Sequence, residues 1–221
     1  RDTLGVSLLA HPVTQFGYLA YKQCYLLAKP LFSWLRTSLS GSQKPIKFCI
    51  HSSPYKRCLQ TTLYSIENLK TLIDQEKIQQ PVEFMIRIDN FLSEYYYNDY
   101  FFKLALSDNI PFSANVITND GKCDRVQNTL VESNESWLCN ELKNRENISY
   151  DSNWEKNRLG DYGSFNDNLD NFTTRCLNGA CNLIDYYTEE NQEESSDTVN
   201  ICLVITHGSL INNYLNNYGN A

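Results

Sequence analysis

Short apolar runs alternate with long segments of helical periodicity along this chain. The apolar runs cover residues 46–51 and 199–206, residues 82–88 form a third strand candidate, and turn-forming or polar residues bound each of them. A short continuous apolar run is typical of a strand buried on both faces, as in parallel sheets. Parallel neighbours need a crossover connection, which a helix usually supplies. The alternation therefore predicts an α/β fold, a three-layer α/β/α sandwich around a mainly parallel sheet.

The predicted helices occupy the segments around these runs. Apolar residues recur every three or four positions within residues 14–39, 55–78, 166–187 and 208–217. Thr14 is a candidate N-cap, and Pro30 is expected to interrupt or kink the first helix. Residues 189–197 are acidic and are predicted to form a solvated loop.

The middle of the chain, about residues 95–163, lacks a clear period. It is aromatic at first and polar later. We interpret it as an irregular insertion with short helices, of a kind that can cover a site. Residues 1–221 are accordingly interpreted as one partial domain that carries this insertion.

Composition restricts the class of protein. Of the 221 residues, 42% are hydrophobic, which supports a globular chain with a buried core. A net charge of -7 disfavours nucleic-acid binding through a basic face, although it leaves room for a local basic pocket. The sequence shows neither an apolar run long enough to span a bilayer nor a signal peptide.

The cysteines indicate a reducing compartment. None of the eight forms a Cys-x-x-Cys pair, so neither a zinc site nor thioredoxin-type chemistry is expected. Cys49 and Cys202 lie within apolar runs, where cysteine acts as a small core residue. We therefore expect a protein of the cytoplasm or nucleus.

Three polar segments lie at or just beyond the ends of predicted strands, the edge where open α/β sheets bind ligands. Arg57 falls in the first turn of a predicted helix, where its guanidinium and the free backbone N–H groups both suit a phosphoryl oxygen. A surface arginine on an amphipathic helix is the competing interpretation. His207 ends the run 199–206 and can donate to a phosphoryl oxygen, or it can simply bond to a nearby carbonyl. Glu94 follows the run 82–88 among aromatic residues and is a candidate general acid, although most such glutamates are solvated.

The order and spacing of these segments resemble the histidine phosphatase (phosphoglycerate mutase-like) superfamily along most of the chain. Two motifs are specific, Ser53-Pro54-x-x-Arg57-x-x-Gln60-Thr61 and the Thr-His-Gly of residues 206–208. The supporting similarities are Pro-Val-Thr-Gln-Phe-Gly at residues 12–17, Leu-x-Glu-Tyr at 92–95, and the helix that includes Arg175.

The resemblance implies a phosphatase that works through a phosphohistidine. In that mechanism Arg57 holds the phosphoryl oxygens, His207 stabilises them as charge builds, and Glu94 protonates the leaving oxygen. Ser53, Thr206 and Gly208 are the further substrate-binding candidates. The implied substrate is a phosphorylated small molecule or a phosphoprotein, with no metal or organic cofactor and no direct binding of nucleic acid or membrane. The sequence gives no oligomeric state.

The chain departs from the family pattern because it contains no Arg-His-Gly motif, which would carry the nucleophile. Its histidines are His11, His51 and His207. His11 matches a non-catalytic family position, and His51 is interpreted as structural or pocket-lining. The nucleophile is therefore expected on a first strand before Arg1, and residues 199–206 should form an exposed edge of the sheet.

A non-catalytic relative is the alternative. Some fungal members of this superfamily are subunits of a transcription-factor assembly, and this chain is rich in asparagine and tyrosine. In that case the middle insertion and the acidic loop would be partner surfaces. A mutase is a third option that no residue in the chain favours.

Overall fold

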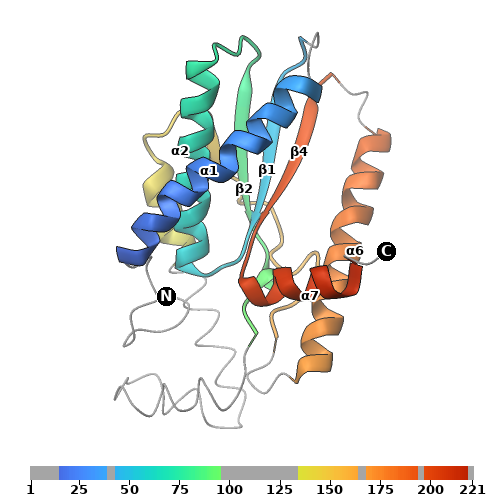
Figure 1. Cartoon of the computed structure of the whole chain (residues 1–221). Helices are drawn as coiled ribbons and strands as arrows, with labels where there is room; N and C mark the ends of the chain where they lie inside the picture. The colour runs from blue at the N-terminus through green and yellow to red at the C-terminus, as the bar shows by residue number, and fades with distance from the viewer. Residues whose placement is uncertain (1–14, 39–42, 96–133, 164–167, 194–196, 219–221) are drawn as a thin grey trace.

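The computed structural model describes residues 15–38, 43–95, 134–163, 168–193 and 197–218 (Figure 1). Residues 134–142 are helical. The labelled elements, in chain order, are α1 (Gln15–Ser38), β1 (Ile46–Ser52), α2 (Lys56–Gln75), β2 (Val82–Ile88), the 3-10 helix η2 (Asn90–Leu92), β3 (Ile148–Tyr150), α6 (Leu169–Glu193), β4 (Val199–Ile205) and α7 (Gly208–Tyr218).

The four strands form one sheet in the order β3-β2-β1-β4, and every pair is parallel. The prediction of an α/β fold with a mainly parallel sheet is thus confirmed. Ser52 of β1 pairs with both Ile88 of β2 and Ile205 of β4, so these three strands end at the same level. Within the described residues β4 lies at an edge of the sheet, as expected.

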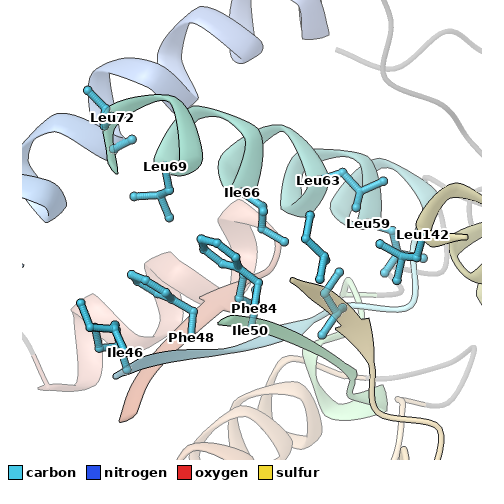
Figure 2. Packing of buried hydrophobic residues seen from close by; sticks show 14 of the residues in the cluster. Ile46, Phe48, Ile50, Leu59, Leu63, Ile66, Leu69, Leu72, Phe84 and Leu142 are labelled. Carbon is cyan, nitrogen blue, oxygen red and sulfur yellow. The ribbon is translucent and has the colours of Figure 1, made fainter. Parts of the chain in front are cut away.

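One face of the sheet packs against α1 and α2. Alternate residues of the central strands, such as Phe48 of β1 and Phe84 of β2, point towards α2, and their rings stack with centroids 4.9 Å apart (Figure 2). The apolar stripe of α2 covers them with Leu59, Leu63, Ile66, Leu69 and Leu72. Burial of each such side chain contributes about 1.5–3 kcal/mol before conformational entropy is subtracted.

The other face of the sheet is met by α6. His51 of β1 contacts Tyr187 of α6, so helices lie against both faces. A second core joins η2, α6 and α7 near the carboxyl ends of the strands, and Figure 1 shows α7 crossing below that edge. Gly179 permits a close approach there, because a Cβ on it would lie 2.1 Å from Cδ2 of Phe91.

Three elements differ from the sequence-based expectation. α1 continues through Pro30, because Ala28 before it and Phe32 after it are buried in the same core. α6 extends to Glu193, so part of the predicted acidic loop is helical. The segment interpreted as an irregular insertion contains β3, which pairs with β2. Three residues are too few to show a strand period. Thr14 and residues 96–133 lie outside the described residues.

No helix in the described ranges is both long enough and apolar enough to cross a membrane.

Candidate functional site

The parallel strands bring three separate segments to one edge of the sheet. Because Ser52, Ile88 and Ile205 are in register, the residues that follow them emerge side by side. A hydrogen bond from the Ser53 N–H to the Ile205 carbonyl (3.0 Å) ties two of these exits together. The Asp89 N–H donates to the Ser52 carbonyl (3.0 Å) and ties the third.

Arg57, Glu94 and His207 meet at this edge. The guanidinium Nη2 of Arg57 lies 3.1 Å from Nδ1 of His207 and 3.5 Å from Oε2 of Glu94. The same carboxylate oxygen lies 3.3 Å from Nδ1 of His207. The side chains of Arg57 and Glu94 remain 17% and 21% exposed, so a ligand can reach them. The structure therefore brings together three residues that are distant in the sequence. Glu94 follows Arg57 by 37 positions, and His207 follows Glu94 by 113 positions.

His207 is buried and is held from several sides. Its Nε2 lies 2.9 Å from Oγ of Ser53, and its ring contacts the ring of Tyr55 edge-on at 4.7 Å between centroids. The Cys58 thiol lies 3.6 Å from the same nitrogen. The Arg57 guanidinium can only donate, so a hydrogen bond to Nδ1 requires the tautomer in which Nδ1 accepts and Nε2 donates to the Ser53 hydroxyl.

The surroundings of His207 favour the neutral imidazole. Burial lowers its pKa well below the usual range, and the nearby cations of Arg57 and Arg175 lower it further. Burial and these two cations therefore favour the uncharged ring at neutral pH. A bound anion would compensate the Arg57 charge and stabilise the protonated ring.

Glu94 is oriented by bonds to one of its two carboxylate oxygens. The Ser209 hydroxyl and the backbone N–H of Tyr95 both donate to Oε1. Oε2 is left facing Arg57 and His207. This arrangement aims one carboxylate oxygen at the place where a ligand would contact Arg57.

Two helices begin at the site. Arg57 is the second residue of α2, and the preceding N-cap Tyr55 makes no capping hydrogen bond with its side chain. Gly208 begins α7, and the N–H of Ile211 donates to the His207 carbonyl (3.2 Å). The starts of two helices add partial positive charge, which suits an anion.

The other two substrate-binding candidates, Thr206 and Gly208, make different contacts from those of Ser53. The Thr206 hydroxyl donates to the Leu92 carbonyl (2.9 Å) and so ties the end of β4 to η2. Gly208 is exposed beside His207, with open space where a side chain would be. Of the three substrate-binding candidates, Ser53 is the one that contacts a member of the Arg57–Glu94–His207 cluster directly.

Sequence reasoning missed four residues that support the cluster: Tyr55, Cys58, Arg175 and Ser209. Tyr55 and Cys58 lie at variable positions of the Ser53-Pro54-x-x-Arg57-x-x-Gln60-Thr61 motif, which gave no reason to select them. Ser209 directly follows the Thr-His-Gly motif, and that adjacency was the available signal. Arg175 was noted only as part of a helix, and nothing in its spacing pointed to the site.

His51 contacts a different set of residues from the Arg57–Glu94–His207 cluster, and these contacts support a structural role. Its side chain is fully buried, with Nδ1 2.6 Å from Oδ2 of Asp89 and Nε2 2.7 Å from the Tyr187 hydroxyl. The indole N–H of Trp154 donates to the other Asp89 oxygen (2.8 Å). Burial also raises the pKa of Tyr187, so its hydroxyl stays protonated and donates to His51. His11 lies outside the described residues.

The described residues contain no group of three or more histidine, cysteine or acidic side chains placed to bind a metal ion.

A scan of the sequence against protein-family models and a search of curated proteins both find no match.

Proposed function

We propose that this chain carries the phosphate-binding part of a histidine phosphatase, a phosphoric monoester hydrolase of the phosphoglycerate mutase-like superfamily. The observation that supports this function is the convergence of Arg57, Glu94 and His207 within 3.1–3.5 Å at the carboxyl ends of parallel strands. A cation, a buried imidazole and a carboxylate at one point are the groups that transfer of a phosphoryl group requires.

Each residue has a role that fits its geometry. Arg57 and the backbone N–H groups at the start of α2 hold the phosphoryl oxygens. His207, fixed by Ser53, donates to the same oxygens once the anion has favoured its protonated form. Glu94, in its protonated form, gives its proton to the leaving oxygen.

The nucleophile of the proposed reaction is the histidine that the resemblance implies for the intact protein, and it is none of His11, His51 and His207. Among the described strands β4 pairs with β1 on one side only, which leaves its outer side for the strand that the resemblance implies. The histidine nitrogen forms a bond to phosphorus while the bond from phosphorus to the leaving oxygen breaks. Water then cleaves the nitrogen–phosphorus bond and releases inorganic phosphate. The proposed substrates are phosphorylated small molecules or phosphoproteins, and the chemistry needs no cofactor.

Sulfate binding and hydrolysis test this proposal together. Isothermal titration calorimetry of the 221-residue chain should show saturable binding of inorganic sulfate, which His207→Ala weakens. The full-length protein should hydrolyse p-nitrophenyl phosphate and form an acid-labile phosphoenzyme. Absence of sulfate binding by the chain would instead favour the non-catalytic scaffolding relative. Sulfate binding without hydrolysis by the full-length protein would indicate a relative that has lost catalysis but kept the anion site.

The pH dependence of sulfate binding is the second expected result. His207 has a lowered pKa in the free site, and a bound dianion raises that pKa, so binding takes up a proton between the two values. Affinity should therefore fall as pH rises through that window, by up to about tenfold per pH unit. Calorimetry from pH 5 to 8 measures this slope, since sulfate keeps its charge over the range.

The slope is measured in the Glu94→Gln variant, so that this carboxylate does not contribute to it. The control is the double variant Glu94→Gln/His207→Gln. The slope should disappear in the control. An equal slope with and without His207 would show that this histidine takes up no proton.

A further inference from the structure

Arg175 of α6 binds the backbone that carries Glu94. Its Nη1 donates to the carbonyls of Phe91 (2.7 Å) and Ser93 (3.1 Å), and its Nη2 donates to the carbonyl of Glu94 (3.4 Å). The Leu92 carbonyl, which lies between them, accepts the Thr206 hydroxyl. All four consecutive carbonyls of residues 91–94 therefore have a donor from α6 or from the end of β4.

The neighbouring packing holds the guanidinium in this place. The Phe172 ring lies 5.2 Å from the guanidinium carbon of Arg175, in a cation–π contact. One turn further along α6, Gly179 has no side chain and so lets the Phe91 ring lie directly against the helix. A helix that approaches this closely can deliver a planar group with several donors to adjacent carbonyls.

We propose that Arg175 is a positioning residue, which fixes the Glu94 carboxylate beside Arg57 and His207 by holding the backbone of residues 91–94. This inference rests on the proposed anion site, because its effect is read through Glu94. Arg175 acts on the carbonyls, whereas Ser209 and the Tyr95 N–H act on the carboxylate itself. Removal of the backbone bonds should let Glu94 move away while the anion-binding groups stay in place.

A double-mutant cycle with sulfate as the probe tests this role. Glu94→Gln removes a negative charge that competes for Arg57, so it should tighten sulfate binding about three- to fivefold in the wild-type chain. Arg175→Lys keeps the positive charge but lacks the planar fork that binds three carbonyls. In the Arg175→Lys background Glu94→Gln should change affinity less than twofold, because Glu94 no longer stands beside Arg57.

Arg158→Lys is the matched control. Arg158 also lies over an aromatic ring, that of Trp154, with 5.4 Å from the guanidinium carbon to the ring centroid. In that background Glu94→Gln should retain its full effect. The measured quantity is the ratio of sulfate affinities with and without Glu94→Gln in each background. An equal ratio in the Arg175→Lys and wild-type backgrounds overturns the proposal, because a general loosening of the fold would weaken both affinities and leave the ratio unchanged.

Two further measurements separate the ways in which the test can fail. Circular dichroism checks that Arg175→Lys is folded, and Thr206→Val, which removes the donor to Leu92, takes its place in the cycle if it is not. If the wild-type chain binds no sulfate, the proposed function fails. The rate of amide hydrogen exchange at Tyr95, whose N–H donates to the Glu94 carboxylate, then measures directly how firmly that carboxylate is held. Exchange should be at least severalfold faster in Arg175→Lys, and equal rates would overturn the inference.

Discussion

Replacement of Arg57 by alanine is expected to weaken sulfate binding by the 221-residue chain about 10- to 100-fold. Hydrogen bonds to charged groups contribute roughly 1.5–3 kcal/mol each, and the Arg57 guanidinium lies within 3.5 Å of both His207 and Glu94. The loss has a second cause, because Glu94 would then repel the anion without a neighbouring guanidinium to offset it. Isothermal titration calorimetry at low ionic strength measures the change.

Two further variants show whether the guanidinium itself is required. Arg57→Lys keeps the charge without the bidentate fork and should lie between wild type and Arg57→Ala. Arg36→Ala removes an exposed arginine of α1 that pairs with Glu76, and it should leave affinity within about twofold of wild type. If Arg57→Ala and Arg36→Ala have similar small effects, sulfate is attracted by general charge and the site is not at Arg57.

Asp89→Ala should lower the free energy of unfolding by about 3 kcal/mol. The Asp89 carboxylate is fully buried and accepts from both His51 Nδ1 and Trp154 Nε1. Without it, two buried donors lose their acceptor, and each unsatisfied group costs about 1–3 kcal/mol. Urea unfolding followed by tryptophan fluorescence measures the change.

The matched control is Asp197→Ala, at an exposed position before β4, which should change stability by less than about 0.5 kcal/mol. His51→Ala combined with Asp89→Ala should cost less than the sum of the two single variants, because each removes the same hydrogen bond. A loss below 1 kcal/mol for Asp89→Ala would mean that water or another group replaces the carboxylate, and that His51 and Asp89 are not a structural pair.

The helices and longer strands followed from the sequence because their signals are local. The predicted strands at 82–88 and 199–206 match β2 and β4 to within one residue, because a short, mostly apolar segment bounded by polar residues is a local signal. The expectation that residues 199–206 are buried on both faces is wrong, because β4 lies at the edge of the described sheet and Cys202 and Val204 are exposed. β3 was missed because its three residues are stabilised by pairing with β2 rather than by their own pattern. The helix is not interrupted at Pro30, because tertiary burial on both sides of it outweighs the local cost of one lost hydrogen bond.

In the candidate site, too, some features follow from the local sequence and others follow only from tertiary packing. The sequence by itself determined that Arg57, Glu94 and His207 follow strand ends, because each lies within a few residues of a periodic segment. Only the tertiary structure decided that they meet, because the order β2-β1-β4 and the shared register bring the three exits together. It alone also placed His51 with Asp89 and brought Arg175 from α6 to the Glu94 backbone. These contacts join residues 37 to 150 positions apart and depend on packing, which no local pattern encodes.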